Sequence, residues 1–413
     1  METSPRIIVI GHLASKPVGN ASIYPHSFDQ STDTIEPLDL AGRDNRSQPA
    51  AICFSSGTSG PPKGVVMSHY NLLAQILGLR STNPFLHRSR VHEVFFPSFA
   101  HVYGLVSAVL MPAWIGSYLQ IMKRFDYLEY LRRCADIKAT VLRLVPAAAV
   151  RMIKDPTVKQ LDLTSVQAVM CSGAGLSDST VEALKGMLAP GAGVLNGYGM
   201  TEATVTLLRE TRTDKGASVG RPAAGVSIRI VDDEMKDVQS GVDGECLIRG
   251  PTVFLEYKDN PSATLEAKGH DGWLRTGDIV RVDADGFFYL TGRKKDLIKF
   301  RGNQIAPAEL EAVILLDSRV TDAGVCGAFD KGLDTEIPVA FVTLKDSASL
   351  SSSKRTEILR QVKHFVNERV APYKKLRRDL VHMKTLPKNA SGKLLRRVLT
   401  TEATKLAQRQ TKL

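Results

Sequence analysis

Short apolar runs alternate along the chain with stretches whose apolar residues recur at helical spacing. Three of these runs are typical of buried strands, and they cover residues 50–54, 141–146 and 166–171. After the third run, Ser177 and Asp178 precede Val181 and Leu184, which predicts an N-cap and a helix with one apolar face. Strands that alternate with helices favour a parallel sheet, and the strand ends of such a sheet are the usual place for ligands.

The pattern changes on both sides of this region. Residues 6–10 predict a short strand, and residues 19–49 are rich in polar residues, Pro and Gly, which is typical of a linker or a long loop. Beyond residue 221, short β-rich runs separated by Gly- and Asp-containing turns predict a small sheet or barrel. Residues 320–345 predict two further strands, and residues 356–370 predict a helix with one apolar side.

Composition narrows the class of protein. A chain of 413 residues is long enough for a large core and for more than one domain. Its 43% hydrophobic and 23% charged residues are ordinary for a soluble globular protein, and no apolar run has the length of a membrane span. The start shows no secretory signal pattern, and the 5 cysteines lack metal-site or disulfide spacing. We therefore expect a reduced, intracellular setting.

The formal net charge is +11, and it is unevenly distributed. Residues 353–413 contain 17 Lys and Arg but only 4 Asp and Glu, so this segment accounts for the excess. A basic surface can attract nucleic acid, anionic lipid or polyphosphates such as ATP and coenzyme A, although a solvated helix surface is the ordinary explanation. We expect no nucleic-acid partner, because no recognisable reader module or aromatic stacking platform accompanies the charge.

The most informative stretch directly follows the first predicted buried strand. It comprises Ser55, Ser56, Gly57, Thr58, Ser59, Gly60, Pro61, Pro62, Lys63, Gly64 and Val65. Glycine lets backbone N–H groups crowd an anion, hydroxyl groups add donors, and lysine adds a full positive charge. The Walker pattern does not fit, because Gly64 stands where that pattern has Ser or Thr. A flexible turn is the ordinary alternative, but the ordered string favours a phosphate-binding loop.

This loop resembles the phosphate-binding signature of the adenylate-forming superfamily, which includes acyl-CoA synthetases, luciferases and peptide-synthetase adenylation domains. Further motifs follow in the family order at residues 172–176, 196–203, 272–279, 291–302 and 386–397. Within the superfamily, the chain most resembles the 4-coumarate–CoA ligase-like acyl-CoA ligases, from about residue 52 to residue 397.

The resemblance implies an α/β adenylate-forming fold with a large N-terminal α/β domain, a small β-rich subdomain and a small mobile α+β C-terminal domain. We expect a short strand and polar lead-in over residues 1–49, the AMP-binding core over 50–292 and the mobile domain over 293–413. Full-length relatives carry a further α/β subdomain ahead of the phosphate loop, so the N-terminal domain would be truncated at its start. A fragment, a mispredicted gene and a natural short form all remain open.

The resemblance also implies which residues bind ATP and its metal. Tyr198 would stack on adenine, Thr201 would donate to a phosphate, and Glu202 would hold Mg2+ through oxygen. The metal matters because adenylation brings a carboxylate against an α-phosphate, and these two anions repel each other. The nucleotide-binding set is Ser55, Ser56, Gly57, Thr58, Ser59, Gly60, Lys63, Gly173, Ala174, Tyr198, Gly199, Thr201, Asp278, Arg293 and Lys393.

Without the resemblance, several of these residues have ordinary explanations. The turn 172–176 is typical of a strand-to-helix connection, Asp278 of a turn or capping residue, and Arg293 of a solvated surface charge. By resemblance, the small residues of the turn leave room for adenine, Asp278 accepts both ribose hydroxyls, and Arg293 contacts the nucleotide.

Catalytic roles by resemblance fall to His101, Lys299 and Lys393, together with Thr58 and Lys63 of the loop. A histidine in an apolar stretch is by itself more typical of the core, but the matching histidine lies beside the acyl carboxylate. Lys393 would bridge the substrate carboxylate and the α-phosphate in a first pose, where charge develops during attack.

The same resemblance implies a pivot and an acyl pocket. The chain would turn about Lys295 and bring Lys299 to the site in a second pose. Tyr103, Ser107 and Gly197 would line the acyl pocket, although packing is their ordinary explanation.

We therefore expect an enzyme, an ATP-dependent carboxylate–CoA ligase of secondary metabolism that forms an acyl-AMP and then an acyl-CoA thioester. It would use a small carboxylic acid, ATP, Mg2+ and coenzyme A. An adenylating enzyme with a non-CoA acceptor and a truncated inactive remnant are the alternatives, and the acid and the oligomeric state stay open. The terminal Thr411, Lys412 and Leu413 depart by one residue from the Ser-Lys-Leu peroxisome signal, so peroxisome and cytoplasm are both expected locations.

Overall fold

The computed structural model describes residues 7–10, 21–24, 39–55, 62–171, 176, 178–208, 215–345, 347–388 and 394–410. The chain divides into two compact units, residues 1–44 and residues 45–413. In the first unit, strand β1 (Ile7–Ile10) pairs in parallel with β2 (Ala21–Tyr24), with Val9 opposite Ile23. The short strand expected at the start is confirmed, but β2 occupies part of the stretch expected to be a linker or loop. A four-residue segment that includes Ile23 and Tyr24 finds a partner strand there, which polar composition alone does not reveal.

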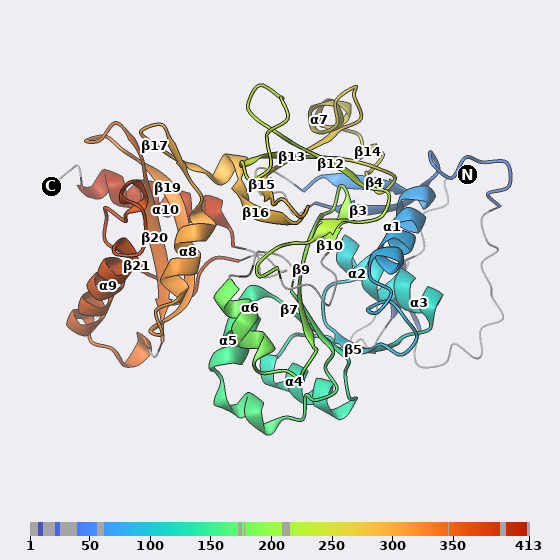
Figure 1. Ribbon diagram of the computed structural model, residues 1–413, viewed down its shortest axis with the longest axis horizontal. Coiled ribbons are helices and arrows are strands. Elements are labelled where there is room, and N and C mark those ends of the chain that lie inside the picture. Colours follow the sequence, from blue (N-terminus) through green and yellow to red (C-terminus); the bar gives the residue numbers. More distant parts are fainter. Residues whose placement is uncertain are drawn as a thin grey trace. The chain divides into compact units, whose positions relative to one another are not determined.

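The second unit contains a mixed five-stranded sheet, part of which is the parallel sheet that the alternation of strands and helices predicted (Figure 1). Its parallel strands are β7 (Val141–Leu144), β8 (Ala168–Cys171) and β9 (Gly193–Met200). The antiparallel strands β10 (Thr204–Leu208) and β11 (Arg221–Pro222) extend it beyond β9. Helices α4 (Tyr127–Asp136), α5 (Pro146–Lys154) and α6 (Asp178–Lys185) share one buried cluster with β7 and β8. The helices cover one face of both strands, and Val141, Ala168 and Met170 on the other face pack in a second cluster, so both strands are buried along their length.

A second parallel pair joins β5 (His92–Phe95) to β6 (Tyr118–Ile121). Between them the chain forms α2 (Val102–Gly104), the π-helical segment η1 (Leu105–Leu110) and α3 (Met111–Ile115). A Cβ at Gly104 would collide with the Ser98 carbonyl, so glycine allows the turn before α2 to lie tightly against that helix. The short 3-10 helix η2 (Pro156–Gln160) follows α5.

The phosphate loop connects two strands of a three-stranded antiparallel sheet, in the order β14-β4-β3. These strands are β3 (Pro49–Phe54), β4 (Gly64–Ser68) and β14 (Glu256–Tyr257). The expectation that residues 50–54 form a buried strand is wrong, because Ile52 is 48% and Phe54 64% exposed. The reason is the position of β3 at the edge of this sheet, whereas β4, between its two neighbours, is buried. Helix α1 (His69–Thr82) follows β4 and starts with a capping box formed by Ser68 and Asn71.

The β-rich part beyond residue 221 is confirmed as a four-stranded antiparallel sheet. Its strands, in spatial order, are β12 (Ser227–Val231), β13 (Gly244–Arg249), β15 (Leu274–Val282) and β16 (Phe288–Arg293). Helix α7 (Pro261–Ala267) precedes β15.

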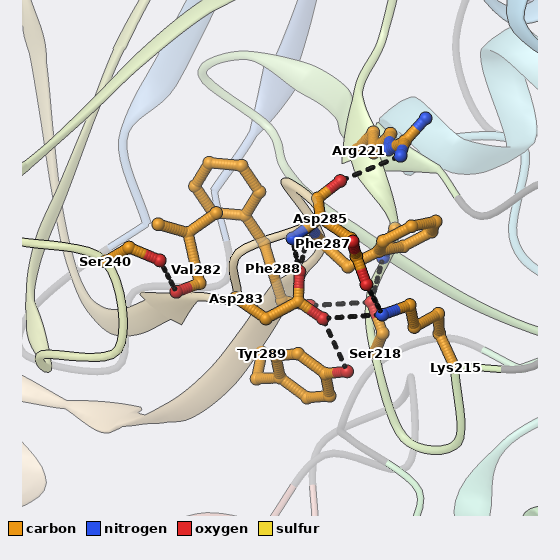
Figure 2. A network of polar contacts seen from close by, with 11 residues as sticks. Lys215, Ser218, Arg221, Ser240, Val282, Asp283, Asp285, Phe287, Phe288 and Tyr289 are labelled. Atoms are coloured by element: carbon orange, nitrogen blue, oxygen red, sulfur yellow. Dashed lines mark hydrogen bonds and ion pairs between the residues drawn. The ribbon is translucent and has the colours of Figure 1, made fainter.

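A network of polar contacts holds the turn between β15 and β16 against the preceding loop (Figure 2). The Lys215 ammonium pairs with Asp283 at 3.1 Å and also with Asp285, and Arg221 donates to the Asp285 carbonyl at 2.7 Å. The Tyr289 hydroxyl donates to Asp283 at 3.3 Å. This turn joins the two strands whose opposite ends carry Asp278 and Arg293.

After β16, the 3-10 helix η3 (Lys294–Asp296) and the hairpin β17 (Ile298–Phe300) and β18 (Asn303–Ile305) lead into the C-terminal part. There, β19 (Val320–Asp330), β20 (Thr335–Leu344) and β21 (Val381–His382) form one sheet. Helices α8 (Pro307–Leu315) and α9 (Ser352–Asn367) share one buried cluster with it, and α10 (Arg396–Gln410) shares another. Short 3-10 helices are η4 (Ser347–Ser349) and η5 (Pro372–Lys374).

The buried clusters fall into two groups along the chain. Three clusters draw their members from residues 51–290, and two draw theirs from residues 298–406. Among the described residues, no buried cluster combines members of both groups. In the same part of the chain, none of the helices has the length and apolarity needed to cross a membrane.

Candidate active site

A large cavity of about 3140 Å3 lies in the second unit, and most of the predicted site residues face it. The predicted residues that line it are Ser55, Lys63, His101, Tyr103, Ser107, Gly197, Tyr198, Gly199, Thr201, Glu202, Asp278, Arg293 and Lys295. They come from the phosphate loop, the segment after β5, the end of β9, the β15–β16 hairpin and η3. The fold therefore brings together residues that are separated by up to 240 positions in the sequence.

The remaining predicted residues stand apart from this group. Lys299 is exposed on β17, where its backbone N–H donates to Glu336 at 2.8 Å, and it does not line the cavity. The other predictions lie outside the described residues, namely Ser56, Gly57, Thr58, Ser59, Gly60, Gly173, Ala174, Lys393, Thr411, Lys412 and Leu413.

The two ends of the phosphate loop are joined by backbone contacts. The Ser55 N–H donates to the Lys63 carbonyl at 2.9 Å, and the Lys63 N–H donates to the Ser55 hydroxyl at 3.4 Å. Both residues therefore lie together at the paired ends of β3 and β4, and both line the cavity. The Lys63 ammonium lies 4.7 Å from the centroid of the Tyr257 ring, a distance typical of a cation–π contact.

Tyr257 is a site residue that the sequence did not reveal. Its hydroxyl donates to Oε1 of Glu202 at 2.8 Å, and its ring makes the cation–π contact with the Lys63 ammonium. Burial, followed by the Glu202 charge, raises the pKa of Tyr257, so the hydroxyl remains a donor. Tyr257 thus connects the phosphate-loop lysine with the predicted metal ligand, although it lies 55 residues from Glu202.

The Glu202 carboxylate suits a magnesium ion bound together with a nucleotide. Mg2+ usually takes one or two carboxylates, with waters and substrate phosphates completing the shell. Glu202 is buried and lines the cavity, where Lys63 also lies. The described residues contain no group of three or more His, Cys, Asp or Glu that could form a cage of their own. A metal at Glu202 would therefore rely on phosphate oxygens for further ligands.

A second polar group is centred on the buried Asp278. The Tyr198 hydroxyl donates to its Oδ2 at 2.7 Å, and the Arg293 Nε donates to its Oδ1 at 2.6 Å. Burial by itself would lower the pKa of Arg293, but the charge of Asp278 and its hydrogen bond, with smaller contributions from Tyr198 and Asp296, together raise that pKa. Each carboxylate oxygen has a second lone pair, so both can still accept a ligand hydroxyl. The Tyr198 ring is buried and held in place by its hydroxyl, and it also lines the cavity.

His101 caps α2, the short helix that carries Tyr103 of the predicted acyl pocket. Its Nδ1 accepts the backbone N–H of Tyr103 at 3.1 Å, which assigns the proton of the neutral ring to Nε2. The imidazole therefore has a structural task and also lines the cavity. The Tyr103 hydroxyl accepts a hydrogen bond from Arg143, a cavity residue on β7 that the sequence did not single out.

Ion pairs flank Lys295 on both sides. Lys294 pairs with Asp233 at 2.9 Å and with Glu245 at 3.0 Å, and both partners belong to the β-rich sheet and its turn. Asp296 lies 3.5 Å from Arg396, which also pairs with Glu311 of α8. Burial, followed by the nearby Arg293 charge, lowers the pKa of Lys295.

Comparisons with known proteins place these features in a family. The AMP-binding enzyme model matches residues 5–258, and the AMP-binding enzyme C-terminal domain model matches residues 309–393. A probable CoA ligase of Humulus lupulus is 35% identical over 376 residues, which cover 89% of this chain and 66% of the relative. The peroxisomal OPC-8:0-CoA ligase of Arabidopsis thaliana is 34% identical and covers 86% and 64%, respectively. The chain thus spans slightly less than two-thirds of the length of these relatives.

Solved structures show the same similarity. ATP-bound MatB from Rhodopseudomonas palustris aligns with a TM-score of 0.76 and 26% identity, over 87% of this chain and 69% of the other. An anthranilate CoA ligase in complex with anthranoyl-AMP aligns with a TM-score of 0.77 and 27% identity, over 88% and 69%. The α/β adenylate-forming fold expected from the sequence is confirmed.

Proposed function

The chain belongs to the AMP-binding enzyme family, and on this basis we propose that it is an ATP-dependent carboxylate–CoA ligase. A carboxylate attacks the α-phosphate of ATP to give acyl-AMP and pyrophosphate, and the coenzyme A thiol then displaces AMP to form a thioester. The observation that carries the proposal is the shared cavity, in which Lys63, Glu202 and the Asp278–Arg293 pair all face one space.

The nucleotide would lie across the two polar groups of the cavity. Asp278 can accept ribose hydroxyls while Tyr198 and Arg293 hold its carboxylate, and the fixed Tyr198 ring can stack on the base. Lys63 and Thr201 contribute a cation and a hydroxyl on the phosphate side. Mg2+ held by Glu202 would neutralise phosphate charge, so that the acid and the nucleotide can approach each other.

The two half-reactions need different groups at one site, and the structure supports Lys295 as the pivot. The residue before it is ion-paired to the β-rich sheet, and the residue after it is ion-paired to α10. A rotation at Lys295 could keep both sets of ion pairs. The buried clusters also separate between residues 290 and 298, which supports domains over 50–292 and 293–413.

The second pose would bring Lys299 from its exposed position to the cavity. Lys393 in the first pose, and Thr58 in the phosphate loop, complete the proposed catalytic set with Lys63 and His101. The named location of the Arabidopsis relative supports a peroxisomal setting, and the cytoplasm is the alternative.

The proposal is tested with the purified chain, ATP, Mg2+, coenzyme A and a panel of carboxylic acids. We expect ATP to raise the melting temperature, and mass spectrometry to detect an acyl-AMP and then an acyl-CoA. Asp278→Asn should lose the ATP effect, whereas Asp237→Asn, at an exposed carboxylate paired with Arg229, should keep it. A folded chain that neither binds ATP nor forms acyl-AMP with any acid would refute the proposal.

A further inference from the structure

A half-buried lysine at the end of α7 donates to backbone oxygens. Lys268 directly follows the helix as its C-cap, and its ammonium donates to the carbonyls of Phe254 at 3.0 Å and Leu255 at 2.8 Å. The ammonium also lies 5.4 Å from the centroid of the Phe254 ring, a distance typical of a cation–π contact. Burial is the main reason that the pKa of Lys268 is lowered, and the charge of Glu256 acts in the opposite direction. A lysine side chain usually keeps its ammonium in water, so a half-buried ammonium held by two carbonyls calls for an explanation.

The two carbonyls belong to a segment, residues 254–257, that joins two parts of the site. The Phe254 N–H donates to the Glu202 carbonyl at 2.8 Å, so the segment holds the backbone of the predicted metal ligand. The Leu255 N–H donates to the Val66 carbonyl at 2.9 Å, and the last two residues of the segment pair with β4, the strand that follows the phosphate loop. The segment therefore connects the end of the phosphate loop with Glu202.

Tyr257, the last residue of this segment, contacts the two charged groups themselves. Its hydroxyl donates to Glu202 at 2.8 Å, and its ring centroid lies 4.7 Å from the Lys63 ammonium. Its backbone N–H donates to the Thr264 hydroxyl oxygen of α7 at 2.9 Å. Thr264 and Lys268 are four positions apart, so α7 and its cap hold the segment at two points about one helical turn apart.

Lys268 contacts the segment from outside the cavity. Lys63, Glu202 and Tyr257 line the cavity, whereas Lys268 does not, so any effect of Lys268 on the reaction passes through residues 254–257. Lys63 and Glu202 serve the triphosphate and its metal. These take part in the first half-reaction alone, because pyrophosphate leaves before coenzyme A reacts. The contribution of Lys268 should therefore be confined to adenylation.

We propose that Lys268 is a positioning residue for adenylation, and that by fixing residues 254–257 it holds the cation and the carboxylate of the phosphate site in place. These groups are Lys63 and Glu202. The inference rests on the proposed function and adds to it a residue that acts through Tyr257, without contact with ATP or the acid. Pre-positioned groups favour ATP binding because they lose less freedom when the nucleotide arrives.

The test replaces the ammonium by an apolar group in Lys268→Met. ATP affinity in the presence of Mg2+ is measured by titration calorimetry, and the KM for ATP by pyrophosphate exchange with an acid that supports it. Kd and KM should each rise roughly three- to tenfold, which corresponds to the loss of about one hydrogen bond. Thioester formation from the supplied acyl-AMP should stay within about twofold of the wild type, since it uses neither the triphosphate nor its metal.

Two further variants control for charge and for folding. Lys258→Met removes an exposed ammonium, paired with Asp259 at 2.8 Å, that directly follows the same segment, and it should leave ATP affinity unchanged. Thr264→Val removes the acceptor of the Tyr257 N–H and keeps the shape of the side chain. It should weaken ATP binding and spare thioester formation, as Lys268→Met does.

A double variant shows whether Lys268 acts through Tyr257. Tyr257→Phe alone removes the hydrogen bond to Glu202. If both residues belong to one positioning unit, the loss of ATP affinity in Lys268→Met/Tyr257→Phe should be smaller than the product of the two single losses. Residues that act independently would give the full product.

The outcomes distinguish the inference from the proposed function. Equal losses in both half-reactions, a lower melting temperature with unchanged ATP affinity, or the full product in the double variant overturns the inference and leaves the proposed function intact. If Lys268→Met does not fold, Thr264→Val decides, and unchanged ATP affinity in that variant overturns the inference. If the variants weaken ATP binding as expected but the wild type forms no acyl-AMP with any acid, the proposed function alone is overturned. A folded wild type that binds no ATP overturns both.

Discussion

Protonation of the buried His87 imidazole should cost the protein stability as the pH falls from 6.5 to about 3. His87 is 6% exposed, and its Nε2 is buried with no hydrogen-bond partner among the described residues. Burial, followed by the charge of Arg143, lowers its pKa from 6.5 to about 3. The unfolded chain therefore binds a proton below pH 6.5 that the folded chain does not, and this linkage favours unfolding.

The size of the effect follows from the pKa difference. Each pH unit between the two pKa values costs about 1.4 kcal/mol, so the loss by about pH 5 is about 2 kcal/mol. Below the folded-state pKa both states are protonated, and the contribution of His87 no longer changes. Above pH 6.5 the imidazole is neutral in both states, and the full stability is present.

Urea unfolding of the wild type and His87→Gln at about pH 7.5 and about pH 5 provides the assay. The 2 tryptophans, Trp114 and Trp273, both precede residue 291, so their fluorescence reports the part of the chain that contains His87. The variant has its own packing cost at both pH values, but its loss between them should be smaller by about 2 kcal/mol. His270→Gln, at an exposed histidine, should behave like the wild type. Equal losses in His87→Gln and the wild type would refute the reasoning.

Three further predictions concern the cavity and the pivot. Tyr257→Phe removes the hydrogen bond to Glu202 but keeps the aromatic ring that contacts Lys63. The Mg2+-dependent affinity for ATP, measured by calorimetry, should therefore fall roughly three- to tenfold. An unchanged affinity would contradict the role of Tyr257. Asp278→Asn leaves Arg293 without its carboxylate partner, so the melting temperature measured by differential scanning calorimetry should fall even without ATP. An unchanged melting temperature would show that the pair is not buried as described. Arg396→Met removes the ion-pair partner of Asp296 and Glu311, and it should alter thioester formation from supplied acyl-AMP more than pyrophosphate exchange. The control Arg397→Met, at an exposed arginine, should alter neither reaction. Equal effects of Arg396→Met on both half-reactions would argue against a role at the pivot.

Local sequence was a good guide where a residue's role depends on its neighbours along the chain. The alternation of apolar runs and helical faces predicted the parallel strands β7 and β8, and turn-rich spacing predicted the antiparallel β-rich sheet, whereas β9 was not predicted as a strand. It was a poor guide to the burial of β3, whose apolar residues look like those of a core strand. Whether Ile52 and Phe54 are covered depends on what lies beside that edge, and no local pattern encodes it.

The site was predictable as a set of residues but not as a set of contacts. Tyr198 and Asp278 are separated by 80 residues, Glu202 and Tyr257 by 55, and Glu93 and Arg143 by 50. Each member of the first pair belongs to a motif, so both were named in advance, although their hydrogen bond was not. Tyr257 and Arg143 belong to short strands without a motif of their own, and the contacts that give them a role exist after folding alone.

The sequence by itself determined the chemistry that this protein can offer: a glycine- and hydroxyl-rich loop with Lys63, a carboxylate at Glu202, a family of folds and a basic C-terminal segment. These features follow from residue type and from spacing over a few positions, which the chain carries whether or not it is folded. The tertiary structure decided that Lys63, Tyr257 and Glu202 form one connected group, that Asp278 is shared between Tyr198 and Arg293, and that Arg143 donates to the Tyr103 hydroxyl. Hydrogen bonds and ion pairs act over a few ångströms in space, and packing alone determines which distant residues come within that range.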